Sequence, residues 1–110
     1  MNDSAKDAKE FFRDARLDLT GPLDGVLVLE VSSTCAGPRC GCMLADYGAD
    51  VIKVERPGAP DIGRRLPPHL PNTDPPISFF DAAVNRNKRN ISLDLSNQVG
   101  RDLFLDLVRD

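Results

Sequence analysis

Apolar and polar positions along the chain fall into short blocks that predict alternating strands and helices. Val26 to Val31 is an almost unbroken aliphatic run, typical of a strand buried on both faces, and Asp50 to Glu55 supplies a second strand. Between them, Pro38 suits the first turn of a helix, and Gly48 suits its left-handed C-terminal end. A strand, a helix and a strand within about thirty residues predict a right-handed βαβ unit with parallel strands.

The second half of the chain predicts one more strand and two more helices. Segment 57–76 holds seven of the nine prolines and is expected to be a long loop, a feature that is often functional in compact domains. Ile77 to Val84 predicts a short helix, and the alternation from Asn90 to Leu95 predicts a third strand. Ser96 is expected to cap a final helix. The apolar face of that helix, which needs a sheet to cover, consists of Val99, Leu103, Phe104, Leu107 and Val108.

The pattern divides the chain into a short extension and one domain. Residues 1–21 are expected to form an N-terminal helical extension, with a helix from Ser4 to about Leu17 that Thr20-Gly21-Pro22 ends. Residues 22–110 then form the start of one open, parallel α/β sheet. A length of 110 residues with 41% hydrophobic content allows one small core.

Charge and cysteine content narrow the classes of partner. The net charge is −3 with both signs interspersed, so neither nucleic acid nor a membrane surface is an expected partner. The N-terminus lacks the apolar region of a secretory signal, and we expect a cytoplasmic protein. Cys35, Cys40 and Cys42 indicate a reducing compartment, and their spacing, with His69 as the only histidine, predicts no metal site.

Two features predict an anion site at the carboxyl ends of the strands. The loop from Ser32 to Gly37 has small side chains and backbone N–H groups at a helix start, although an ordinary connecting loop has the same composition. Arg56 follows the strand-ending Glu55 and suits a phosphate on a ribose; the alternative is a solvated Glu55–Arg56 pair. A nicotinamide site is disfavoured because the chain has no G-x-G-x-x-G pattern.

Further basic residues lie at Arg64-Arg65 and in the asparagine-rich segment 85–90. Asparagine tolerates unusual backbone angles, so segment 85–90 predicts a tight turn, and we expect Arg86, Lys88 and Arg89 to have a mainly structural role. No spacing of carboxylates singles out a catalytic residue.

Four blocks of sequence resemble the opening of the family III CoA-transferases, also called the CaiB/BaiF type. The blocks are P-L-D-G-V-L-V-L-E at 22–30, A-G-P at 36–38, L-A-D-Y-G-A-D-V-I-K-V-E at 44–55 and N-R-N-K-R-N-I-S-L-D-L at 85–95. The resemblance runs from Pro22 to Asp110. It implies a Rossmann-like fold, of which this chain supplies an incomplete, N-terminal portion of the large CoA-transferase domain.

The resemblance also implies which residues contact coenzyme A (CoA). By comparison with the family's formyl-CoA transferases, the matching positions are Cys35, Ala36, Arg56, Leu93, Asp94, Leu95 and Ser96. Arg56 would then bind the 3′-phosphate of CoA. Three positions depart from the family: Cys35 replaces a glutamine, Ser33 a histidine found in some members, and Ser96 a lysine. These changes predict a substrate other than formyl-CoA and oxalate.

The activity that the resemblance implies is transfer of CoA from an acyl-CoA to a carboxylic acid through an aspartyl intermediate. The nucleophilic aspartate is expected beyond residue 110, so the chain alone is expected to be inactive and to contain no catalytic residue. No prosthetic group is implied. The family pattern predicts an interlocked homodimer, or a heteromer with a related subunit. The alternatives are an acyl-CoA racemase of the same superfamily and a non-catalytic nucleotide-binding module.

Overall fold

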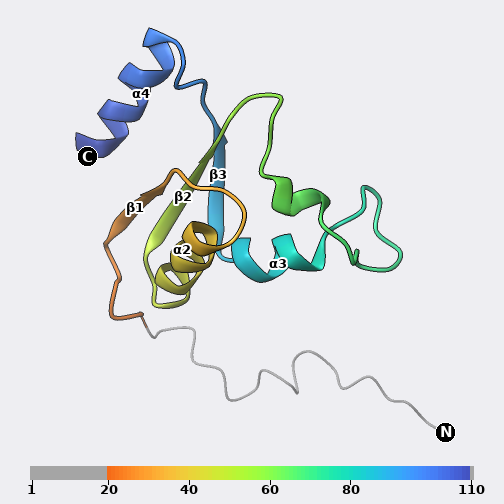
Figure 1. Ribbon diagram of the computed structural model, residues 1–110. Helices are drawn as coiled ribbons and strands as arrows, with labels where there is room; N and C mark the ends of the chain where they lie inside the picture. Colours follow the sequence, from red (N-terminus) through yellow and green to blue (C-terminus); the bar gives the residue numbers. More distant parts are fainter. Residues whose placement is uncertain (1–19, 110) are drawn as a thin grey trace, which may run out of the picture.

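A computed structural model describes residues 20–109, which contain a three-stranded parallel sheet with helices around it (Figure 1). The strands are β1 (Leu27–Glu30), β2 (Asp50–Glu55) and β3 (Lys88–Ser92), and β2 lies in the centre. The predicted α/β fold with parallel strands is therefore confirmed. The helix expected over residues 4–17 lies outside the described residues.

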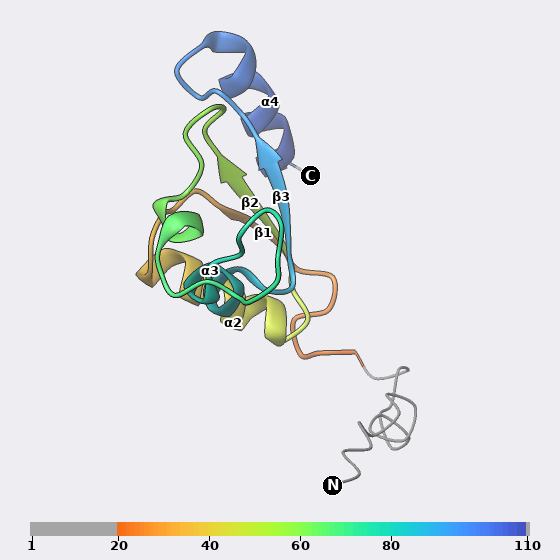
Figure 2. The ribbon, with the colours of Figure 1, turned by 90° about the vertical axis from the view of Figure 1, so that its right-hand side faces the viewer.

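The helical elements are α2 (Ala36–Asp46), the 3-10 helix η1 (Ile62–Arg65), α3 (Phe79–Asn85) and α4 (Gln98–Arg109). α2 packs against all three strands, and α3 lies beside α2, so that these two helices form one layer (Figures 1 and 2). α4 lies past the carboxyl ends of β2 and β3 (Figure 2). No helix among residues 20–109 is long and apolar enough to cross a membrane.

Small side chains let α2 lie close to the sheet. Its buried positions, Pro38, Gly41, Cys42 and Ala45, recur at helical spacing and form one face. The helix ends at Asp46, and Gly48, two residues later, has a φ of +100°, which confirms the predicted left-handed residue. The backbone of Gly21 packs against this end, where a Cβ atom on Gly21 would lie 2.1 Å from the carbonyl oxygen of Tyr47.

Several element boundaries differ from the predicted ones: the first strand is shorter, Leu27–Glu30 rather than Val26–Val31, and the third strand ends at Ser92 rather than Leu95. The third strand begins at Lys88 rather than Asn90, because the residues after the turn already pair with β2. The short helix begins at Phe79 rather than Ile77, because the Ser78 hydroxyl accepts the first free N–H groups. Ser96 does not cap the last helix; the cap is Asn97, whose side-chain oxygen accepts from the N–H of Gly100.

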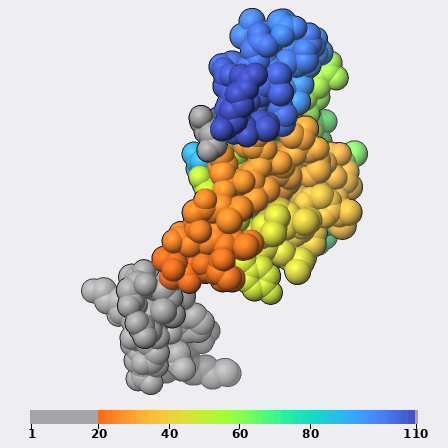
Figure 3. Space-filling model, turned by 90° about the vertical axis from the view of Figure 1, so that its left-hand side faces the viewer, coloured from red at the N-terminus to blue at the C-terminus, as the bar shows by residue number. Residues whose placement is uncertain are grey.

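β1 is not buried on both faces, contrary to the sequence-based expectation. Leu27 is 39% exposed, because strand alternation puts it on the face opposite to that of Val28, which packs on α2, and residues 20–109 cover that other face only in part. Across a gap of about 390 Å³, Leu27 and Leu29 face Leu107 and Val108 of α4. Figure 3 shows α4 as a separate mass above the β1 segment. The apolar face of α4 is thus only partly covered, and Val99 at its start is 69% exposed.

Candidate functional site

Two open grooves meet at the carboxyl ends of the strands. The first, of about 420 Å³, lies between the loop after β1 and the loop after β2; the second, of about 290 Å³, lies between the ends of β2 and β3. Both are lined by Val31, Val54, Glu55 and Arg56. This edge of a parallel sheet is where α/β proteins commonly bind their ligands.

Beneath the first groove lies a cluster of four charged residues, Glu30, Lys53, Asp61 and Lys88. The Lys53 ammonium lies 2.8 Å from Glu30 and 3.0 Å from Asp61, and its side chain is 1% exposed. Lys88 lies 2.7 Å from the second oxygen of Glu30. Two ammonium groups and two carboxylates balance each other, which is what allows charges to be buried here.

Partners in the cluster keep both Lys53 and Asp61 ionised. Burial works against the charged forms of both groups, but the bonds from Lys53 to Glu30 and Asp61 raise the pKa of Lys53. Burial likewise opposes the Asp61 carboxylate, yet hydrogen bonds from the N–H groups of Gly63 and Thr34 and from Lys53 hold the pKa of Asp61 below 3.8. Both side chains are therefore charged at neutral pH.

A glycine in α2 makes room for this cluster. A Cβ atom on Gly41 would lie 2.0 Å from the Glu30 carboxylate. The adjacent turn of α2 also takes part, because the Lys88 ammonium donates to the carbonyl oxygen of Pro38 at 2.7 Å. The small residues of α2 thus leave space for the charged cluster and also let the helix pack closely on the apolar core.

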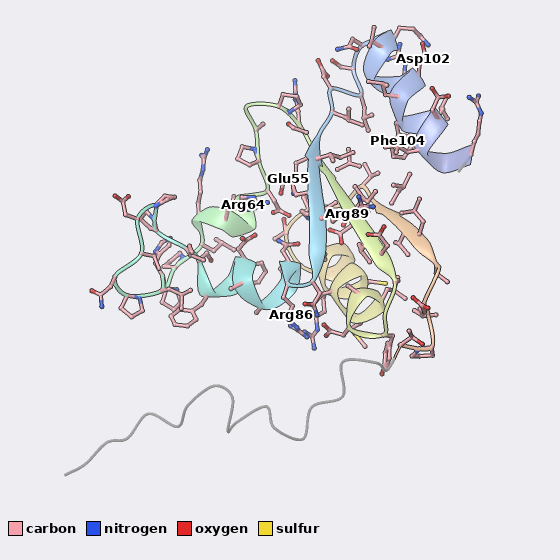
Figure 4. The ribbon with its side chains drawn as sticks, turned by 180° about the vertical axis from the view of Figure 1, so that it is seen from behind. Glu55, Arg64, Arg86, Arg89, Asp102 and Phe104 are labelled. Carbon is pink, nitrogen blue, oxygen red and sulfur yellow. The ribbon has the colours of Figure 1, made fainter. Side chains whose placement is uncertain are left out.

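Arg56 lies at the junction of the two grooves and is exposed. The surface pair between Glu55 and Arg56, which was the alternative to a phosphate site, is not formed: Glu55 instead binds Arg64 of η1, with an N–O distance of 3.0 Å (Figure 4). Among residues 20–109, the Arg56 side chain forms no hydrogen bond or close ion pair, although, together with the hydrogen bonds from Ser96, its charge helps to lower the pKa of Asp94, on the second groove. Because Arg64 neutralises the neighbouring carboxylate, the guanidinium of Arg56 is available to an anion.

The loop Ser32 to Gly37 only partly matches the anion cradle that its composition predicts. The N–H of Thr34 is already bound to Asp61, and Pro38 has no N–H to offer. Cys35 and Ala36 are exposed at the start of α2, but neither lines the two grooves. The structure therefore brings Cys35 and Ala36 to the same edge of the sheet without placing them in the same groove as Arg56.

Leu93, Asp94, Leu95 and Ser96 line the second groove together with Arg56. The Asp94 carboxylate accepts hydrogen bonds from the hydroxyl and N–H of Ser96, and these bonds hold the pKa of Asp94 below 3.8. Ser96 therefore holds the Asp94 side chain in place through two local hydrogen bonds. The segment implied by the resemblance thus lies where Arg56 can share a ligand with it.

The basic segment 86–89, which includes the turn before β3 and the first residues of β3, lies at the opposite, amino end of the sheet, and its charges are neutralised. Arg86 binds Asp46, and Arg89 binds Asp50 with a distance of 2.8 Å (Figure 4 labels both arginines). Asn87 adopts a φ of +61°, as expected for a tight turn. These contacts agree with the mainly structural role predicted for the turn.

Asp61 and Lys53 are the residues at the groove that sequence reasoning missed. A signal for Lys53 was present, because strand alternation places it on the same face as the apolar Val51. No comparable local pattern marks Asp61, which lies in a proline-rich loop. Within the described part of the chain, no group of three or more histidine, cysteine, aspartate or glutamate side chains could hold a metal ion.

Comparison with known proteins gives consistent matches. Residues 23–110 match the model of CoA-transferase family III. A formyl-CoA:oxalate CoA-transferase of Rhodopseudomonas palustris (strain BisA53) is 44% identical over 83% of this chain and 21% of its own length. A succinyl-CoA:mesaconate CoA-transferase of Haloarcula hispanica is 46% identical over 80% and 22%. A CaiB/BaiF family structure from Brucella suis superposes with a TM-score of 0.72, at 40% identity over 82% of this chain and 24% of its own. The chain thus spans about a fifth of these curated relatives.

Proposed function

Because the chain belongs to CoA-transferase family III, we propose that it supplies part of the CoA site of an enzyme that transfers CoA from an acyl-CoA to a carboxylic acid. The observation that carries this proposal is Arg56, an exposed arginine at the junction of two grooves whose side chain forms no hydrogen bond or close ion pair in residues 20–109. A guanidinium fits a phosphate with two parallel hydrogen bonds. The 3′-phosphate of CoA would supply that anion.

The proposed ligand lies along the carboxyl edge of the sheet. Leu93 to Ser96 share the second groove with Arg56 and would contact the nucleotide part of CoA. Cys35 and Ala36 lie at the start of α2 and would contact a more distant part of the same ligand. No prosthetic group is required by this scheme.

The proposed chemistry takes place on a carboxylate outside this chain. That aspartate attacks the acyl-CoA carbonyl, giving a mixed anhydride and free CoA thiolate. The thiolate then attacks the aspartyl carbonyl of the anhydride, which releases the first acid and leaves an aspartyl-CoA thioester. The incoming acid takes up CoA by the same two steps in reverse. Residues 1–110 alone are accordingly expected to show no turnover.

Two further features support an intracellular, multi-subunit enzyme. Cys35, Cys40 and Cys42 are all free thiols, which suits a cytoplasmic location. The exposed apolar residues of α4 favour an assembly in which further protein covers them, such as the interlocked dimer that the resemblance implies. Transfer is favoured over racemisation because the two curated relatives above are named transferases.

The test compares the affinities of the full-length protein for CoA and 3′-dephospho-CoA by calorimetry at fixed salt. Arg56→Ala should remove most of the preference for CoA, a loss of about 1.5–3 kcal/mol, or roughly 10- to 150-fold. Arg65→Ala is the matched control, because Arg65 is also exposed but lines neither groove. Equal affinities for the two ligands in the unsubstituted protein would exclude this role for Arg56.

A further inference from the structure

Asp61 joins the two loops that form the walls of the first groove. Its carboxylate accepts hydrogen bonds from the N–H of Thr34, in the loop after β1, at 2.9 and 3.0 Å. It also accepts from the N–H of Gly63 at 2.9 Å, in the 3-10 helix η1 that follows the loop after β2. The Asp61 side chain is 1% exposed, so these bonds are shielded from water. One buried carboxylate therefore connects both walls.

The wall after β1 needs such a support. Thr34 has a φ of +68°, a left-handed conformation that a β-branched residue rarely adopts unless its surroundings hold it there. Lys53, which is paired with Asp61, also donates to the carbonyl oxygen of Ser32 at 3.1 Å. The Asp61–Lys53 pair thus binds the backbone of this loop at two points.

The same pairing makes a carboxylate compatible with an anion site. Asp61 and Glu55 both line the first groove, and each would repel a phosphate if its charge were free. Lys53 neutralises Asp61, and Arg64 neutralises Glu55. The positive charge of Arg56 is therefore not cancelled within the groove that Asp61 helps to build.

We propose that Asp61 is a positioning residue for CoA: it holds the loops 32–34 and 59–63 in place, so that the groove beside Arg56 is formed before the ligand arrives. This inference rests on the proposed function, in which that groove receives CoA. Preforming a site lowers the conformational entropy that binding must otherwise remove. Asp61 itself need not touch the reacting atoms.

The test measures CoA binding to the full-length protein by calorimetry for Asp61→Asn and for Glu30→Gln. Both substitutions remove one negative charge next to Lys53, but Glu30 makes no bond to either loop among residues 20–109. We expect Asp61→Asn to weaken CoA binding about 10-fold with unchanged stoichiometry. Glu30→Gln should change the affinity of the folded fraction less than about 2-fold. Partial unfolding alone would lower the stoichiometry and leave the dissociation constant unchanged.

Amide hydrogen exchange in the unsubstituted protein gives a second measurement that needs no variant. The Thr34 N–H should exchange much more slowly than that of the exposed Ser33, since only Thr34 binds the buried carboxylate. Equal effects of the two substitutions, or fast exchange at Thr34, would overturn the inference. If both variants fail to fold, the exchange rate of the Thr34 N–H is the measurement that tests the inference. A slow Thr34 amide in a protein that binds no CoA would support the loop contact and refute the proposed function instead.

Discussion

Both ends of the sheet contain arginines and carboxylates, but the two ends differ in which of these charges are neutralised by internal ion pairs. At the amino end, Arg86, before β3, binds Asp46, and Arg89, within β3, binds Asp50, so that both arginine charges are neutralised. At the carboxyl end, the acids are the residues that are neutralised: Glu55 binds Arg64, and Asp61 binds Lys53. The Arg56 side chain is then left without a hydrogen bond or close ion pair among residues 20–109; its charge adds to the Ser96 hydrogen bonds that lower the pKa of Asp94.

This difference shows that a basic run in a sequence does not by itself mark an anion site. In the most basic segment of the chain, 86–89, both arginines are neutralised by acids about forty positions away, and Lys88 is neutralised by the still more distant Glu30. A single arginine after β2 is available because two other cations have taken the nearby acids. What matters for binding is the charge that remains once the internal pairs have formed.

The substitution with the largest expected effect on this comparison is Lys53→Met. It leaves the buried carboxylates of Glu30 and Asp61 without their shared cation, and breaking a buried pair in this way costs about 3–5 kcal/mol. We expect that loss in the free energy of unfolding, measured with urea. Arg89→Met removes a cation from the exposed pair with Asp50 and is the control, with a much smaller loss expected. Similar losses for both variants would show that the two ends do not differ as described.

Arg64→Ala tests whether the carboxyl end depends on neutralising Glu55. Without Arg64, a free carboxylate would line both grooves beside Arg56, and we expect the affinity for CoA to fall about 10-fold, or ~1.4 kcal/mol. The binding of 3′-dephospho-CoA should fall less, because it carries fewer phosphate charges. Calorimetry with both ligands measures the ratio of their dissociation constants.

The double variant Glu55→Gln/Arg64→Ala is the control for that experiment. It removes the competing carboxylate together with its partner, so most of the preference for CoA should return. If the preference stays lost, Arg64 acts by another route, such as its second contact, with Asp81 at 3.4 Å.

Local features of this fold were predictable because they depend on neighbouring residues. The bounds of β2 follow from its aliphatic run, and the left-handed turn at Gly48, just after α2, follows from glycine's freedom at positive φ. The edge position of β1 was not predictable in this way, since it depends on which strands lie beside it. The cap at Asn97 was missed because Ser96, one residue earlier, is an equally good capping residue by type.

Within the candidate site, the sequence predicted Arg56 but not the buried residues that hold the groove in place, Asp61 and Lys53. Arg56 follows a strand and a glutamate, and that local pattern sufficed to single it out. The partners of Asp61 are 8 residues away at Lys53 and 27 away at Thr34, and only the folded chain brings them together. Lys53 could have been recognised as buried, because a charged residue on an apolar strand face requires a partner.

The smallest expected effect concerns the amino end and its dependence on pH. The hydrogen bond from Arg86 is the main reason why the pKa of Asp46 lies below its ordinary value of 3.8. A carboxylate whose pKa is lowered on folding stabilises the fold above its unfolded pKa, and this contribution disappears as the pH falls through the folded pKa. The urea midpoint of Arg86→Ala should therefore lie slightly below that of the unsubstituted protein at about pH 7. The gap should close well below pH 3.8. A gap that persists in acid would mean that Arg86 stabilises the turn through its hydrogen bond to the carbonyl oxygen of Ala83, and not through the charge of Asp46.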